Sequence, residues 1–147
     1  MPKFGKSSKA NLSTCHPDLQ RLFGEVIKVF DCSVIKGHRG EADQNRAYME
    51  KASKLKWPES KHNSNPSMAA DVVPYPICWA EDKKKTNNPQ RRFYFFAGYV
   101  KAVAEIMGIQ IRIGADWDMD TDLGDQTFND LPHFELIETR PPEVYDK

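Results

Sequence analysis

Apolar residues recur at helical spacing in two segments of the chain. The first begins at Pro17, which suits a first helical turn, and predicts an amphipathic helix from about Pro17 to Phe30. The second begins near Gln90 and predicts the longest helix, with Gly108 placed to end it. The apolar positions are Leu19, Leu22, Phe23, Val26, Val29 and Phe30 in the first segment, and Phe93, Phe96, Ala97, Val100, Ala104 and Met107 in the second. Both stripes should face one core.

Short segments between and after these helices have the patterns of strands. Ser33–Lys36 and the apolar run Ala69–Val73 predict two strands, the second one buried and followed by two prolines. Ile109–Ile113 alternates apolar and polar residues, as a half-buried strand does, and Phe134–Ile137 predicts a last strand. Another helix is expected from Glu41 to about Ala52. This irregular order favours an α+β domain with a small, mainly antiparallel sheet flanked by helices.

Length and composition fit one compact globular domain. The chain has 147 residues, of which 39% are hydrophobic and 29% charged, and we expect a single domain over residues 1–147. Ten prolines and a mean hydropathy of -0.66 predict substantial loop and a polar surface. Residues 1–13 and 140–147 are expected to be polar tails.

The charge balance limits the partners of the protein. Lysine and arginine together number 21, as do aspartate and glutamate, so no global field favours nucleic acid or an anionic membrane. Neither a signal-peptide core nor a membrane span is apparent, so we expect cytoplasmic synthesis, and we expect a monomer. The three cysteines, Cys15, Cys32 and Cys78, lack metal-type spacing and should be reduced, buried thiols.

A first candidate for chemistry is the segment from Ser60 to Asp71. It contains His62, one of four histidines, and Asp71 at the start of an apolar strand. An unpaired carboxylate is costly to bury, so something must compensate Asp71. Coordination of a metal ion would compensate the charge of Asp71. His and Asp are both among the residues that supply the three protein ligands of a catalytic zinc site. A buried salt bridge or an edge position is the alternative, and the spacing alone favours that alternative.

A second candidate is the segment Asp130-Leu131-Pro132-His133-Phe134-Glu135. It sets a histidine at the entrance of a strand, with a carboxylate three residues earlier. In metal-assisted hydrolysis, a carboxylate that is not a ligand accepts the proton of the attacking water and passes it to the leaving amine. Asp130 suits that role. Taken alone, the pattern equally fits a core histidine and a turn aspartate.

Together the two segments resemble a known family. The Ser-x-His motif, the following Ala-x-Asp and the late Pro-His-Phe-Glu resemble the zinc DD-carboxypeptidase and L-alanyl-D-glutamate peptidase family, which shares its metal site with hedgehog domains. The likeness is greatest to phage endolysins, and it extends to Thr14–Leu19, Gly37–Glu41 and Asp71–Pro76. The resemblance implies a hedgehog/DD-peptidase-like fold, zinc held by His62, Asp71 and His133, and Asp130 as general base.

The resemblance also implies residues that bind substrate. An arginine and a nearby glutamine ahead of the zinc motif help to hold or polarise the scissile carbonyl in the family, and these match Arg39 and Gln44. A guanidinium there would stabilise the developing oxyanion, although Arg39 taken alone fits a surface ion pair. We also assign Ser60 of the Ser-x-His motif to substrate binding. The gap of nine residues from His62 to Asp71 exceeds the seven of many members, so the substrate-facing contour should differ.

An acidic run, Asp116–Asp125, places oxygens at alternate positions, as calcium loops do. It lacks the glycine and the glutamate that an EF-hand has at its sixth and twelfth positions. A solvated loop is therefore favoured over a Ca²⁺ site, which stays open as an alternative. Trp117 and Trp79 fit either a peptide groove or ordinary packing.

These observations predict a zinc metallopeptidase that cleaves peptidoglycan stem peptides, with the L-alanyl-D-glutamate bond as its target. The family further implies a phage lysis enzyme that accumulates in the host cytoplasm and reaches the cell wall through a holin. A D-alanyl-D-alanine carboxypeptidase would use the same metal site. A non-catalytic wall-binding protein would keep the fold, but the presence of Asp130 and Arg39 argues against that alternative.

Overall fold

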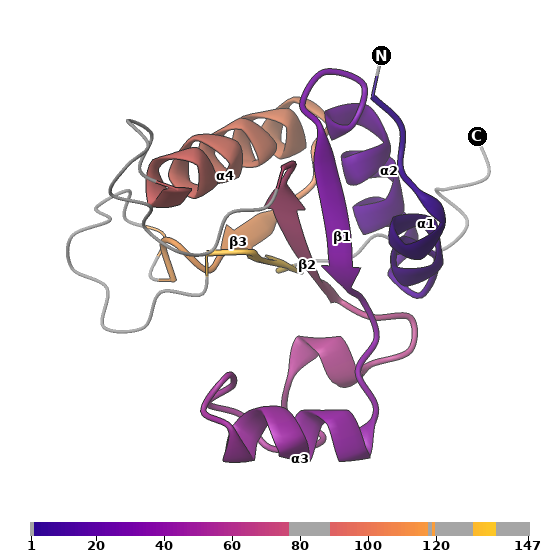
Figure 1. Cartoon of the computed structure of the whole chain (residues 1–147), viewed down its shortest axis with the longest axis vertical. Coiled ribbons are helices and arrows are strands. Elements are labelled where there is room, and N and C mark those ends of the chain that lie inside the picture. Colours follow the sequence, from indigo (N-terminus) through magenta and orange to yellow (C-terminus); the bar gives the residue numbers. More distant parts are fainter. Residues whose placement is uncertain (1, 77–88, 118, 120–130, 138–147) are drawn as a thin grey trace.

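The computed structural model describes residues 2–76, 89–117, 119 and 131–137 (Figure 1). Its elements are α1 (Lys6–Ser13), α2 (Pro17–Val26), β1 (Cys32–Lys36), α3 (Glu41–Met49), the 3-10 turn η1 (Lys61–Asn63), β2 (Ala69–Pro74), α4 (Pro89–Ile106), β3 (Ile111–Ile113) and β4 (His133–Leu136). Within these described ranges, no helix is both long and apolar enough to cross a membrane.

The four strands form one sheet in the order β1-β2-β4-β3, and each neighbouring pair is antiparallel. The predicted α+β class with a small antiparallel sheet is therefore confirmed. β2 is a central strand and is buried at all six positions. Side chains alternate between the two faces of a strand, so Ala70 and Val72 join the core while Asp71 points to the opposite face.

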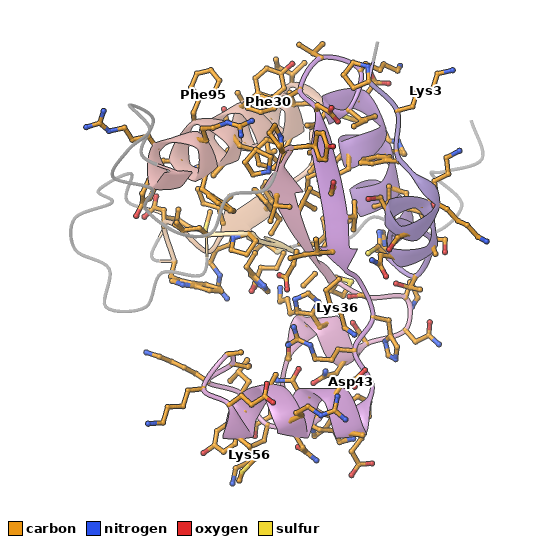
Figure 2. All side chains as sticks on the ribbon, viewed as in Figure 1. Lys3, Phe30, Lys36, Asp43, Lys56 and Phe95 are labelled. Carbon is orange, nitrogen blue, oxygen red and sulfur yellow. The ribbon has the colours of Figure 1, made fainter. Side chains whose placement is uncertain are left out.

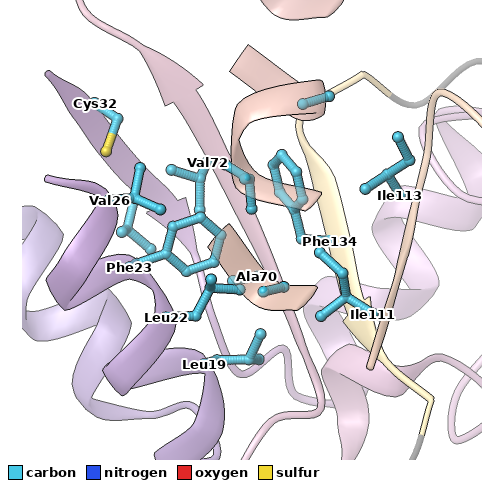
Figure 3. Close-up of a cluster of buried hydrophobic side chains, with 14 of the residues drawn as sticks. Leu19, Leu22, Phe23, Val26, Cys32, Ala70, Val72, Ile111, Ile113 and Phe134 are labelled. Carbon is cyan, nitrogen blue, oxygen red and sulfur yellow. The ribbon is translucent and has the colours of Figure 1, made fainter. Parts of the chain in front are cut away.

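One face of the sheet is covered by α2 and α4, whose apolar stripes meet it as the sequence predicts (Figure 3). The aromatic ring of Phe134 in β4 lies between the two helices. Its centroid is 5.5 Å from that of Phe23 in α2 and 5.9 Å from that of Phe96 in α4, both in edge-on arrangements. This packing fixes β4, and with it the position of His133.

The two long helices end close to where the sequence places them. α4 stops at Ile106, and Gly108 adopts the left-handed backbone (φ 71°) that a helix end commonly needs. α2 stops at Val26, four residues before the predicted Phe30, and turns follow it. Val29 therefore lies outside the core, contrary to the predicted apolar stripe, and is 71% exposed. α3 likewise ends at Met49 rather than at Ala52.

The prediction of a polar tail over residues 1–13 is wrong from Lys6 onward, because α1 packs along the edge strand β1. Ser8 Oγ accepts a hydrogen bond from the backbone N–H of Val34 (3.0 Å), and Asn11 Nδ2 donates one to the Val34 carbonyl (2.8 Å). Leu12 is buried in the core. An edge strand has backbone groups without a sheet partner, and α1 supplies partners for those of Val34. Residues 140–147 lie outside the described residues.

The cysteines fit the prediction of reduced thiols where they can be described. Cys15 and Cys32 are buried and form no disulfide. Burial raises the pKa of the Cys15 thiol to about 11 and that of Cys32 to about 12. Both thiols are therefore protonated and unreactive at neutral pH. Cys78 lies outside the described residues.

α3 and η1 lie beyond one end of the sheet, below the ends of β1 and β2 in Figure 1. Lys36 at the end of β1 reaches toward Asp43 in α3, with Nζ 3.4 Å from Oδ2 (Figure 2). The chain therefore leaves the sheet at Lys36, forms α3, and returns through η1 to β2. The end of the sheet at which these segments join it also carries Asp71 and His133.

Candidate metal centre

Three side chains from separate elements meet at this end of the sheet. His62 comes from η1, Asp71 from β2 and His133 from β4, and one ligand atom of each lies within 4.8 Å of the other two. Asp71 Oδ1 is 3.2 Å from His62 Nε2 and 3.4 Å from His133 Nδ1. All three residues are buried, with at most 9% of their surface exposed.

The register of the sheet brings Asp71 and His133 together. They are direct cross-strand partners in the β2–β4 pair, and Val72 N–H donates to the Pro132 carbonyl (2.8 Å) just before β4. Because neighbouring residues alternate faces, Phe134 enters the core and His133 faces the opposite side. The packing of the core therefore also fixes Asp71 and His133.

His62 is held by hydrogen bonds on both its backbone and its ring. Ser60 caps the short helix, since its Oγ accepts from His62 N–H (3.2 Å) and its own N–H donates to Asn63 Oδ1 (3.0 Å). The ring Nδ1 lies 2.7 Å from the Gly37 carbonyl oxygen. A carbonyl only accepts, so Nδ1 donates this bond, and the Nε2 side of the ring faces Asp71.

His133 is oriented in the opposite sense. Its Nε2 lies 2.9 Å from Glu135 Oε1, and its Nδ1 faces Asp71. Glu135 is not among the site residues that the sequence predicts. The available signal is its spacing, because residues i and i+2 of a strand share a face, so a carboxylate two residues after a candidate ligand is a candidate partner.

The charges of the site are strongly coupled. Burial alone would raise the pKa of Asp71, but the charges and hydrogen bonds of His62 and His133 outweigh burial and hold the pKa of Asp71 well below its usual value. For Glu135, burial acts in the same upward sense, whereas His133 and Arg112 lower the pKa to about 2. Both carboxylates are therefore ionised at neutral pH.

Arg39 approaches the site from the loop between β1 and α3. Its Nη2 lies 3.5 Å from Asp71 Oδ2, the oxygen turned away from the closest histidine contacts, and its side chain is 15% exposed. Its Nη1 donates to Gln44 Oε1 (3.1 Å), and its backbone N–H donates to the His62 carbonyl (2.8 Å). Arg39 is thus tied both to the histidine segment and to Asp71.

Gln44 and Ser60, both expected to bind substrate, are engaged inside the protein. Gln44 is 0% exposed, and its Oε1 accepts from Arg39 and from Asn63 Nδ2 (3.1 Å). Its Nε2 donates to Ser53 Oγ (3.0 Å) and to the Leu55 carbonyl (2.6 Å). With Ser60 capping η1, the geometry favours positioning roles for both residues over direct contact with substrate.

The remaining predicted site features are only partly described. Trp117 is half-buried and its ring centroid is 5.1 Å from that of His133, so it packs against the candidate ligand. Asp116 is 2% exposed, which departs from the solvated loop expected at that position. Asp130, Trp79 and most of the acidic run Asp116–Asp125 lie outside the described residues.

The donor set is compatible with a metal ion, and zinc is the ion against which its spacing can be compared. Zinc bonds of about 2.0–2.1 Å in a tetrahedron separate neighbouring ligand atoms by roughly 3.4 Å, and the two separations from Asp71 Oδ1 are 3.2 and 3.4 Å. Two neutral histidines in these orientations would present lone pairs to a carboxylate, an arrangement that requires a cation or a proton between them. Three protein ligands leave a fourth position for water, as catalytic sites require.

Comparisons with known proteins identify the family of the chain. A family model described as phage L-alanyl-D-glutamate peptidase matches residues 1–137. The L-alanyl-D-glutamate peptidase of Escherichia phage T5 is 29% identical over 92% of this chain and 98% of its own length. The crystal structure of the Serratia marcescens L-Ala D-Glu endopeptidase ChiX superposes with a TM-score of 0.66 at 26% identity, over 91% of this chain and 90% of that one. The chain therefore belongs to the phage L-alanyl-D-glutamate peptidase family.

Proposed function

We propose that this protein is a zinc-dependent endopeptidase that cleaves the L-alanyl-D-glutamate bond of peptidoglycan stem peptides. The observation that carries the proposal is the buried set of His62, Asp71 and His133, with ligand atoms within 4.8 Å and both histidines turned toward the carboxylate. The family and both relatives support the choice of bond, since each is described as acting on L-alanyl-D-glutamate.

His62 Nε2, Asp71 Oδ1 and His133 Nδ1 would hold the ion. When bound there, zinc supplies a Lewis acid that lowers the pKa of water and polarises a carbonyl. Asp130 is assigned as the general base that accepts the proton of the attacking water and delivers it to the leaving amine of D-glutamate. The amide C–N bond breaks, and the alanyl carbonyl carbon ends as a carboxylate. The sequence motif supports Asp130, which precedes His133 by three residues.

Arg39 is assigned to the oxygen of the scissile carbonyl. Its guanidinium has five N–H donors, more than its contacts with Gln44 and Asp71 require among the described residues. A fixed cation beside a developing oxyanion stabilises it most where water is excluded, and the low exposure of Arg39 supports that role. Gln44 then serves to hold Arg39, and Ser60 to hold His62.

The family also suggests the biological setting. A phage enzyme of this class would be made in the host cytoplasm as a monomer, and a holin would give it access to the wall. Its partner would be a peptidoglycan peptide rather than nucleic acid or a lipid bilayer. The acidic run Asp116–Asp125 remains a candidate Ca²⁺ loop.

Digestion of purified peptidoglycan, followed by mass spectrometry of the new termini, tests the proposal. New amino groups on D-glutamate are expected. Released D-alanine would instead indicate a D-alanyl-D-alanine carboxypeptidase. Binding to the wall without any new terminus would indicate a non-catalytic binding protein and would refute the proposed activity.

A further inference from the structure

Glu135 forms a bridge between His133 and two cationic side chains. It is 5% exposed and lies on the same face of β4 as His133. Its Oε1 lies 2.9 Å from His133 Nε2, while its Oε2 accepts from Arg112 Nη2 at 2.9 Å and lies 3.5 Å from Lys61 Nζ. Each carboxylate oxygen therefore has its own partners, and one of them is dedicated to the histidine.

We propose that Glu135 is the positioning residue for His133, holding the imidazole with Nδ1 toward Asp71 and thereby raising the affinity of the site for zinc. The inference rests on the proposed function, since it concerns the same metal site. Arg112 and Lys61 contact the other oxygen of Glu135, so Oε1 is placed to accept a hydrogen bond from Nε2 of His133. A ring with its proton on Nε2 presents the lone pair of Nδ1 to the site. An anionic partner also makes the ring a more basic ligand.

The surroundings keep the Glu135 carboxylate and the His133 ring in this arrangement. Arg112 is the direct cross-strand partner of Glu135 in the β3–β4 pair, and its guanidinium carbon lies 5.4 Å from the Trp117 ring centroid. The Trp117 and His62 rings each lie with centroids 5.1 Å from that of His133. Rotation of His133 is therefore opposed by Glu135 at one ring edge and by two neighbouring rings.

A purely structural role for Glu135 has a different consequence. A buried ion pair that only stabilised the fold would lower the stability of the chelated protein when it was removed. It would leave the zinc affinity of the folded molecules unchanged. Zinc affinity and stability must therefore be measured separately.

The experiment compares Glu135→Gln with the wild type and with Asp18→Asn. The glutamine keeps a carbonyl oxygen near Nε2 but removes the charge. Asp18 is a matched control, since it is a carboxylate with 2% exposure whose ion pair, with Arg21 in α2, is 3.1 Å long. Competition with a chromophoric chelator gives the zinc dissociation constant, and urea unfolding in excess chelator gives the stability. We expect a 10- to 100-fold weaker zinc affinity in Glu135→Gln and no change in Asp18→Asn.

Equal zinc affinity in wild type and Glu135→Gln would overturn the inference but leave the proposed function intact. A wild type that takes up no zinc would overturn both. If Glu135→Gln does not fold, long-range nitrogen–proton NMR of the zinc-loaded wild type decides the matter. The expected spectrum has the His133 proton on Nε2, and a proton on Nδ1 would refute the role of Glu135.

Discussion

The backbone carbonyl of Gly37 contacts a candidate ligand, so replacing Gly37 by alanine should disturb the site. The Gly37 oxygen lies 2.7 Å from His62 Nδ1. A Cβ added at Gly37 would lie 2.3 Å from the backbone oxygen of Asn11, 2.3 Å from Thr14 Oγ1 and 3.0 Å from Cys15 Sγ. Carbon and oxygen without a covalent bond normally stay about 3.3 Å or more apart. The Asn11 oxygen belongs to the backbone of α1, so Gly37 itself must move by roughly 1 Å.

The size of the effect follows from that displacement. A shift of about 1 Å lengthens the contact with His62 beyond the normal hydrogen-bond range. Overpacking of this kind costs about 1–3 kcal/mol, which should lower Tm by roughly 3–10 °C for a domain of this size. Loss of the partner that orients a ligand should weaken zinc binding by about 10- to 100-fold.

Thermal unfolding in chelator and zinc titration would measure the two effects of Gly37→Ala. Gly98→Ala is the matched control, because Gly98 lies within α4 and a Cβ there would have nothing within 4 Å. Alanine in a helix interior should stabilise the control by about 0.5–1 kcal/mol and leave zinc affinity unchanged. Wild-type Tm and wild-type zinc affinity in Gly37→Ala would refute this reasoning about Gly37.

Three further predictions concern the chemistry and the charges of the site. Asp130→Ala should bind zinc normally but lose about 10²- to 10⁴-fold in activity on purified wall. His133→Ala should lose both zinc binding and activity. Full activity of Asp130→Ala would exclude Asp130 as the base. Excess chelator should abolish wall digestion and lower Tm, since an ion that binds only the folded state stabilises it. Added zinc should restore both digestion and Tm. Digestion that persisted without metal would contradict the proposal. The pKa of Glu135 is lowered in the folded state from 4.5 to about 2, so its contribution to stability is present above about pH 4.5 and is lost as pH falls toward 2. Urea unfolding of the chelated protein should show a smaller loss of stability over that range in Glu135→Gln, and an identical loss would exclude Glu135 as a source.

The sequence predicts the elements whose stability comes from repeated apolar spacing. The stripes of α2 and α4 meet one core because burial of apolar area dominates their energetics. The segment Lys6–Ser13 carries little apolar surface, and its contacts with Val34 come from Ser8 and Asn11. Such a helix depends on a distant strand for its partners, so the local pattern alone does not predict it.

The candidate ligands are predictable from sequence, but their supports are not. His62, Asp71 and His133 stand in motifs that resemble a known family, and the sheet register brings two of them into contact. Gly37 and Glu135 act through contacts with His62 and His133 that depend on how separate elements pack. Gln44 shows the same limit, because the motif suggests contact with substrate while its burial favours a positioning role.

Anomalous diffraction at the zinc absorption edge, on crystals grown with zinc, tests the central claim most directly. We expect one strong peak bonded at about 2.0–2.2 Å to His62 Nε2, Asp71 Oδ1 and His133 Nδ1. Absence of a peak among these atoms in zinc-loaded crystals, or a zinc ion held by other side chains, would contradict the proposed metal centre.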